Sequence, residues 1–150
     1  MTRAAVLLAV LTPFALSAQT AKTPAARAAT DAAVYLTPTC GCCGKWVDHL
    51  AAAGFNVKRT VTPDIDAVPA RQRVPQNLRS CHTAVIGRYL VEGHVPADVV
   101  RQLLKDRPDV EGIAVPGMPI GSPGMEGPNP QPYAIVAFGK DGSVYEFARR

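Results

Sequence analysis

"AVYLTPTCGCCGKWVDHLAAAGFNVKRTVT", residues 33–62, is the stretch that decides the fold of this chain. Its first five residues are β-prone and end at a turn that contains a proline, which predicts a short buried strand. Trp46 and Leu50 then recur at helical spacing, and Gly54 is placed to cap the C-terminus of that helix. Residues 55–62 predict a second strand. A strand, a helix and a strand in this order favour two parallel strands joined by a right-handed crossover.

The rest of the chain predicts further strands and a second long helix. Residues 82–86 and 89–92 are typical of a hairpin, and residues 96–108, "PADVVRQLLKDRP", carry an apolar stripe between two prolines. Residues 133–147 predict a C-terminal hairpin around a Lys-Asp-Gly turn. Residues 63–75 are charged and proline-rich, and they predict only weak helical turns. We therefore predict an α/β domain with a central mixed sheet and flanking helices.

The N-terminus has the features of a secretory signal peptide. Arg3 precedes an apolar run that is shorter than the roughly 20 residues of a membrane span, and Pro13 interrupts it. We predict a signal peptide at residues 1–18, a flexible leader rich in Ala, Thr and Pro at 19–32, and one domain at 33–150. The mature protein is expected in a bacterial periplasm, without a membrane span.

The charge of the chain argues against one class of partner. The formal net charge is +4, the cations are spread along the sequence, and aromatic residues make up 6%. A nucleic-acid-binding surface gathers its cations in a patch or a stripe. We therefore expect no nucleic acid among the partners.

A segment rich in glycine and proline separates the second predicted helix from the C-terminal hairpin. Residues 112–132, "GIAVPGMPIGSPGMEGPNPQP", contain five glycines and six prolines, so they cannot form a long helix or central strand. Apolar residues are interspersed in the segment, and they would contribute no stability if the segment were exposed to solvent. A long ordered loop inside a small domain usually has a function, and this one carries Met118 and Met125.

The cysteines are the main chemical signal, since three of the four lie within residues 40–43. Cys40 and Cys43 form a Cys-x-x-Cys pair between a strand and a helix N-terminus, where the helix dipole and backbone N–H groups stabilise thiolates. This is the thioredoxin-like arrangement. Adjacent cysteines pair poorly, so a disulfide within this stretch is expected only between Cys40 and Cys43. Cys42 is superfluous to a dithiol enzyme, whereas a soft metal gains from a third thiolate.

The stretch of residues 40–43 alone is compatible with three interpretations, which are a structural disulfide, a thiol–disulfide enzyme and a metal site. Elsewhere in the chain lie four further soft donors, which are Cys81, His94, Met118 and Met125. Thiolate, thioether and imidazole donors together select Cu(I), and the paired Cys-x-x-Cys knuckles of structural zinc sites are missing here. His49 is expected on the surface of its helix. His82, next to Cys81, is explained equally well by packing and by a ligand role.

Three stretches of the sequence resemble the CopG-type periplasmic copper-resistance proteins, a family long described only as a domain of unknown function. They are "TPTCGCCGKWVDHLAAAGF", "VPQNLRSCHTAVIGRYLVEGHVPADVVRQLL" and "GIAVPGMPIGSPGME", and the resemblance extends over residues 34–147. It implies a thioredoxin-like fold, a cysteine-bridged copper site and a role as a copper oxidoreductase in export or detoxification. The metal-binding residues that it implies are Cys40, Cys42, Cys43, Cys81, His94, Met118 and Met125.

We therefore predict a periplasmic protein that holds Cu(I) as a polynuclear, thiolate-bridged cluster between the helix N-terminus at Cys43 and the loop of residues 112–132. Its expected partners are copper ions and other periplasmic proteins of copper handling or export. Two alternatives stay open. One is a metal-independent thiol–disulfide oxidoreductase that uses Cys40 and Cys43. The other is a passive copper chaperone or store, which the sequence alone does not separate from a copper oxidoreductase.

Overall fold

The computed structural model describes residues 30–150 of the chain. The predicted signal peptide, residues 1–18, and the leader up to residue 29 lie outside the described residues. Seven strands, three α-helices and one short 3-10 helix make up this described part. In chain order they are β1 (Thr30–Leu36), α1 (Gly41–Ala52), β2 (Phe55–Val61), α2 (Pro69–Gln72), a 3-10 helix (Gln76–Leu78), β3 (His82–Ile86), β4 (Tyr89–Glu92), α3 (Ala97–Asp106), β5 (Gly112–Ala114), β6 (Ala134–Phe138) and β7 (Val144–Arg149).

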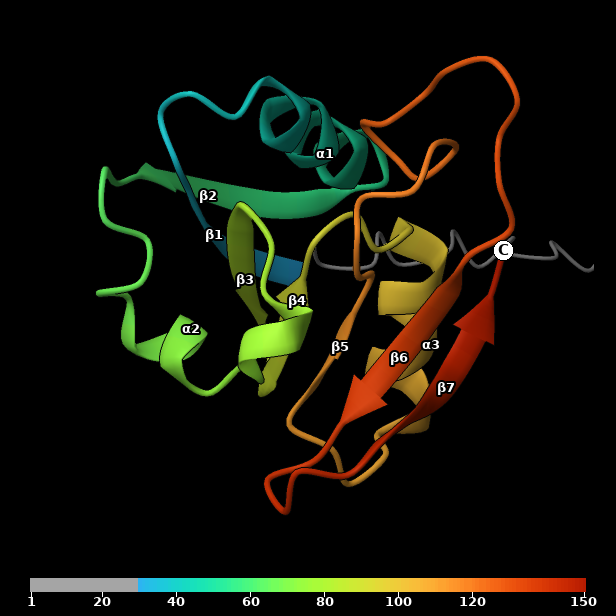
Figure 1. The fold of residues 1–150 in the computed structure, drawn as a ribbon. Coiled ribbons are helices and arrows are strands. Elements are labelled where there is room, and N and C mark those ends of the chain that lie inside the picture. The colour runs from blue at the N-terminus through green and yellow to red at the C-terminus, as the bar shows by residue number, and fades with distance from the viewer. Residues whose placement is uncertain (1–29) are drawn as a thin grey trace, which may run out of the picture.

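All seven strands form one mixed sheet in the order β2-β1-β3-β4-β5-β6-β7 (Figure 1). β1 and β2 are parallel, as the strand-helix-strand pattern predicts, and β4 and β5 are also parallel. The other neighbouring strands are antiparallel. The first four strands, with α1 before β2 and α3 after β4, have the thioredoxin-like order, so the predicted fold class is confirmed. β5, β6 and β7 extend that sheet on the β4 side.

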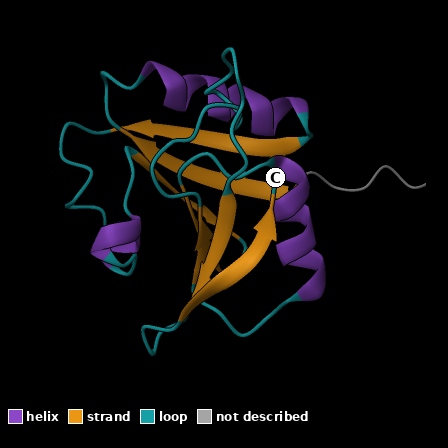
Figure 2. Cartoon of the chain, turned by 45° about the vertical axis from the view of Figure 1, so that its right-hand side comes forward, coloured by secondary structure: helices purple, strands orange, loops and turns teal. Residues whose placement is uncertain are grey.

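The two faces of the sheet carry two separate cores, because side chains alternate along each strand. α1 and α3 cover one face, and α2 with the 3-10 helix covers the other (Figure 1, Figure 2). Along β3, for example, Ala84 and Ile86 join the larger core beneath α1 and α3, whereas Val85 packs against the smaller one. Trp46 and Leu50, the residues whose spacing predicts α1, are fully buried in the larger core.

Most predicted elements are present, and the differences lie at their ends. β1 begins at Thr30, so residues 30–32 belong to the sheet and not to a leader. α1 begins at Gly41, which places Cys42 and Cys43 inside its first turn rather than before it. The prediction also lacks β5, a strand of three residues that lies between β4 and β6. Three residues are too few for a sequence pattern, and only their pairing partners define this strand.

The loop from Val115 to Tyr133, drawn in orange in Figure 1, connects β5 to β6 and lies against α1 (Figure 1, Figure 2). Its closest approach is at Gly124, where an added Cβ would lie 2.7 Å from the Cys42 carbonyl oxygen. Within the described residues, no helix is long and apolar enough to cross a membrane.

The C-terminal hairpin is expected to be part of the larger core rather than a loose extension. Ile135 on β6 is fully buried, whereas Val144 on β7 is 47% exposed. Replacing Ile135 by Ala should lower the free energy of unfolding by about 2–5 kcal/mol, because it leaves a cavity between packed side chains. Val144→Ala removes two methyl groups that are half in solvent and should stay within about 0.5 kcal/mol of the parent. Urea unfolding measures the free energy of unfolding of both variants. An equal loss of stability in the two would contradict a core that includes β6.

Candidate metal centre

The first turn of α1 presents three of the four cysteines. Cys40 is the N-cap of this helix, and its Sγ accepts a hydrogen bond from the Cys43 N–H at 3.3 Å. The first turn contains no acidic residue, so the positive end of the helix dipole is not compensated by a carboxylate. This end of the helix therefore favours negative charge on the sulfur atoms, as the sequence pattern predicts.

Cys81 reaches the same point from another part of the chain. β1 and β3 pair in an antiparallel register that sets Leu36 beside His82. Because Leu36 is the last residue of β1 and His82 the first of β3, the residues just beyond them meet at the same edge of the sheet. Cys81 therefore lies beside the segment that leads into α1, although it is far from that segment in the sequence.

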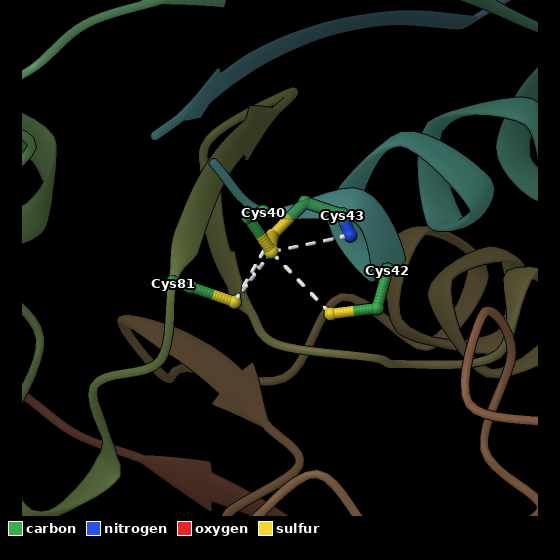
Figure 3. Close-up of side chains that lie close together, drawn as sticks. All are labelled: Cys40, Cys42, Cys43 and Cys81. Atoms are coloured by element: carbon green, nitrogen blue, oxygen red, sulfur yellow. Dashed lines mark hydrogen bonds between the residues drawn. A yellow bond between two sulfur atoms is a disulfide. The ribbon is translucent and has the colours of Figure 1, made fainter. Parts of the chain in front are cut away.

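The four sulfur atoms form one compact group (Figure 3). Cys81 Sγ lies 2.9 Å from Cys40 Sγ and 3.0 Å from Cys43 Sγ, and Cys42 Sγ lies 3.3 Å from Cys40 Sγ. Cys40 and Cys43 are joined in a disulfide, the one pairing that the sequence predicts within this stretch, while Cys42 and Cys81 are free. All four sulfurs lie within 4.8 Å of one another. Reduction of the disulfide would leave four thiols within reach of shared metal ions.

Burial governs the chemistry of the Cys81 thiol. Desolvation raises the pKa of Cys81 to about 11, and the neighbouring Cys42 acts in the same direction. The thiol therefore keeps its proton near neutral pH, and a metal ion that binds there has to displace that proton.

Two buried histidines lie directly beneath Cys81, with each ring held by a backbone carbonyl. His82 Nε2 is 2.9 Å from the Gly93 oxygen, and His94 Nδ1 is 2.7 Å from the Pro123 oxygen. The His82 ring packs against Trp46, with ring centroids 4.4 Å apart. Desolvation lowers the pKa of His82 to about 3 and also lowers the pKa of His94, so both imidazoles are neutral. Neutral imidazole is the form that binds metal.

A buried carboxylate connects the two chain segments that carry these ligands. Glu92 is fully buried; its Oε1 accepts the Ser80 N–H at 2.6 Å, and its Oε2 accepts the Thr83 hydroxyl at 2.6 Å. Arg71 Nη1 lies 2.9 Å from Glu92 Oε1, so the positive guanidinium balances the negative charge of the carboxylate. Burial raises the pKa of Glu92, while the hydrogen bonds and Arg71 act in the opposite direction. Glu92 therefore holds the backbone before Cys81 and the Thr83 side chain after it, and it lies two residues before His94.

The two methionines approach the cysteines from the Pro-Gly-rich loop. Met118 Sδ lies 3.9 Å from Cys81 Sγ, and Met118 itself has a φ of 48°, which residues other than glycine rarely adopt. Met125 and Cys42 both line a groove of about 490 Å³. The loop thus brings the Met118 thioether next to Cys81 and places Met125 in the groove that Cys42 also lines.

The structure brings together the residues that the sequence predicts as metal ligands. The four cysteine sulfurs lie together, and Cys81 also lies within 4.8 Å of a ring nitrogen of His94 and 3.9 Å from Met118 Sδ. Met125 lines the same groove as Cys42. The histidine that the prediction left undecided, His82, forms a second group with Cys81 and His94, and the signal for it in the sequence is its place next to Cys81. His49, which the sequence places on the surface of its helix, is half-buried and makes a specific contact. Its Nε2 accepts the Ala97 N–H at 3.0 Å and so satisfies a backbone group at the start of α3.

Fold and site together define a thioredoxin-like protein with a cysteine-rich candidate metal centre. Residues 78–125 match a family model described as "Protein of unknown function, DUF411". A search of curated proteins finds no match.

Two solved structures are similar to this chain over most of its length. One, described as "Copper resistance protein copG- Form 2", is 42% identical with a TM-score of 0.75, and the match covers 81% of this chain and 98% of that one. The other, "Copper resistance protein copG- Form 1", is 43% identical with a TM-score of 0.74, covering 80% and 96%. This chain therefore belongs to the CopG family of copper resistance proteins.

Gly124 is expected to keep the methionine loop against the cysteines. Gly124 and Gly117 both have positive φ, but only at Gly124 would a Cβ meet other atoms, namely the Cys42 oxygen and the Trp46 nitrogen. Gly117→Ala should cost about 1–2 kcal/mol of backbone strain and leave the loop in place. Gly124→Ala should cost more and displace the loop, so that Cys42 becomes more reactive toward iodoacetamide. Mass spectrometry of the alkylated protein compares the two variants, and the same Cys42 rate in both would contradict this role.

The raised pKa of Cys81 predicts a steep pH dependence of its alkylation. Because only the thiolate attacks iodoacetamide and the pKa is about 11, the rate at Cys81 should rise about tenfold for each pH unit between pH 7 and pH 10. The measurement is peptide mapping of the oxidised protein, in which Cys40 and Cys43 are blocked. Protein unfolded in urea is the control, since its thiols have ordinary pKa values. A Cys81 rate that levels off below pH 9 would contradict the prediction.

Proposed function

We propose that this protein binds Cu(I) in copper resistance, as a thiolate-bridged cluster held by Cys40, Cys42, Cys43 and Cys81. The observation that carries the proposal is the convergence of these four sulfurs within 4.8 Å, from two distant parts of the chain. The two solved relatives are described as copper resistance proteins, which supports copper as the ion.

The donor atoms favour a soft, monovalent ion. Thiolates, thioethers and imidazoles bind Cu(I) well, whereas hard ions such as Mg²⁺ and Ca²⁺ prefer oxygen donors. His94 and Met118 lie at the edge of the sulfur group, and Met125 lies in the groove beside Cys42. They supply further ligands in this proposal.

More than one ion fits this number of sulfurs. Four thiolates so close together repel one another, and cations shared between bridging sulfurs relieve that repulsion. Two or more Cu(I) ions can each bind two or three of these sulfurs, whereas a single ion would leave charged sulfurs unpaired.

The disulfide gives the site a means of changing the oxidation state of copper. In one direction, two Cu(I) ions each give one electron to the Cys40–Cys43 disulfide, which takes up two protons and becomes two thiols, while two Cu(II) ions form. In the other direction, two Cu(II) ions accept the two electrons and the disulfide closes. The structure contains the disulfide end of this step, with the free Cys81 thiol beside it, which supports the proposal. We therefore propose a copper oxidoreductase that acts in the periplasm with other copper-handling or export proteins.

A metal-independent thiol–disulfide oxidoreductase is the second candidate. The observation in its favour is that Cys81 Sγ lies within 3.0 Å of both sulfurs of the disulfide, where its thiolate could attack either one. The free Cys42 and the methionine loop have no task in that reaction. A passive copper chaperone or store is a third candidate that would use the same ligands without redox turnover.

Anaerobic titration of the fully reduced protein with Cu(I), against a competing chelator, tests the cluster. We expect saturation above one Cu(I) per chain. Cys43→Ser should bind less copper because it removes a buried bridging sulfur, whereas His49→Gln should leave the stoichiometry unchanged because His49 lies outside the sulfur group. Saturation at or below one Cu(I) per chain would remove the cluster. Near-zero copper in both the parent and Cys43→Ser would remove the copper function altogether.

A thiol count separates the three candidates. When Cu(I) is added to the disulfide form, an oxidoreductase should produce two new thiols for every two Cu(II) ions formed. A store should bind copper with no change in thiols. The metal-independent enzyme should reduce disulfide substrates without copper, and Met118→Leu should not alter its rate.

A further inference from the structure

Two ring nitrogens beneath Cys81 have no hydrogen-bond partner. In the part of the chain that the structure describes, His82 Nδ1 and His94 Nε2 are buried polar atoms without a partner. A buried polar atom that stays unpaired is destabilising, so two such atoms close together indicate a binding site for a ligand.

The hydrogen bonds of the His82 and His94 rings determine which ring nitrogens are unprotonated. A carbonyl oxygen can only accept, so His82 carries its proton on Nε2, toward Gly93, and His94 carries its proton on Nδ1, toward Pro123. Their other nitrogens, His82 Nδ1 and His94 Nε2, therefore present lone pairs. These two atoms are the unpaired ones, and the carbonyl contacts hold each ring in the tautomer that a metal needs.

Cys81 completes a ligand set that differs in kind from the four sulfurs. Its Sγ and one ring nitrogen of each of His82 and His94 all lie within 4.8 Å of one another. The two rings meet edge to face with centroids 5.1 Å apart, and Met118 Sδ lies 3.9 Å from Cys81 Sγ. Two imidazoles, one thiolate and a more distant thioether are the donors of mononuclear copper sites that transfer electrons.

This ligand set remains complete while the disulfide is closed. Closure removes Cys40 and Cys43 as thiolate ligands, which leaves only Cys42 and Cys81 of the four-sulfur group. None of the His82, His94 and Cys81 donors takes part in the disulfide. The oxidised protein therefore lacks the cluster ligands but keeps two imidazoles and one thiol around a common point.

We propose that the disulfide form binds one Cu(II) ion at Cys81, His82 and His94, with Met118 as a distant fourth ligand. Binding replaces the proton on the Cys81 sulfur with copper, and that proton is released to solvent. The inference rests on the proposed copper function and adds a second site to it. Cys81 belongs to both ligand sets, and the Cu(II) ion of this second site is taken up from solution in its oxidised state, so that its binding involves no change of oxidation state.

The test uses Cu(II) and the Cys42→Ser protein in its disulfide form, where Cys81 is the one remaining thiol and no second free thiol can reduce the ion. We expect one Cu(II) per chain, a visible absorption band from thiolate-to-copper charge transfer, and hyperfine coupling to two nitrogens in the electron paramagnetic resonance spectrum. His82→Phe keeps a ring against Trp46 but removes the nitrogen. It should reduce the coupling to one nitrogen and weaken binding at least about tenfold.

His49→Gln is the matched control, because His49 is the third histidine of the chain and lies outside this group. It should leave the absorption band and the nitrogen coupling unchanged. Absence of the band in the Cys42→Ser protein would overturn the inference and show that the two nitrogens bind water only. Two-nitrogen coupling that persists in His82→Phe would overturn it as well.

The test does not depend on any single variant. If His82→Phe does not fold, the nitrogen count in the Cys42→Ser protein decides alone, and fewer than two nitrogens contradicts the site. The Cu(I) titration of the reduced protein is independent of this experiment. A reduced protein that takes up several Cu(I) ions, together with an oxidised one that binds no Cu(II), would leave the proposed function standing and remove only this second site.

Discussion

The antiparallel pairing of β1 with β3 is the constraint on which the metal centre depends. Its register sets Leu36 beside His82, and this contact brings Cys81 to the cysteines at the start of α1. A slip of one residue would turn every side chain of β3 to the other face of the sheet and send His82 away from Trp46. The register is itself held by the larger core, since Val34, Leu36, Ala84 and Ile86 are all fully buried. The geometry of the site is therefore a consequence of how the sheet packs.

Buried polar groups hold the second half of the centre in place. Glu92 binds the backbone before Cys81 and the hydroxyl of Thr83 after it, while Arg71 matches its charge. A buried ion pair is tolerated when further hydrogen bonds satisfy its polar atoms, and both carboxylate oxygens of Glu92 have partners here. The same strand end leads through Gly93, whose carbonyl orients His82, to His94. Two ligand-bearing segments are thus connected through one carboxylate and one carbonyl, which gives the ligands little freedom to move apart.

The disulfide links the two functions that we propose for this centre. When Cys40 and Cys43 are reduced, four soft sulfurs converge and suit Cu(I); when they are joined, the donors that remain are two imidazoles and one thiol, which suit Cu(II). The loop after β5 brings Met118 next to Cys81 and Met125 into the groove beside Cys42. A thioredoxin-like scaffold supplies the Cys40–Cys43 pair, and the extension of the sheet beyond β4 positions the loop that, in our proposal, adds metal ligands to the scaffold.

Local patterns in the sequence were enough to predict the parallel β1–α1–β2 unit, the hairpin of β3 and β4, helix α3 and the soft donors, because each depends on residues that are neighbours in the chain. The pairing of Cys40 with Cys43 belongs to the same group, since a span of four residues limits the choice.

Three features depended on tertiary structure. β5 exists only through pairing with β4 and β6, and His49 is half-buried because α3 begins beside it. The role of His82 could not be decided from "SCHT" alone. Its Nδ1 is identified as the unpaired ring nitrogen only in the folded protein, where Nε2 is hydrogen-bonded to the Gly93 carbonyl and the ring packs against Trp46. Residue types and short spacings establish which chemistry is available, whereas the atoms that meet are decided by contacts between segments far apart in the chain.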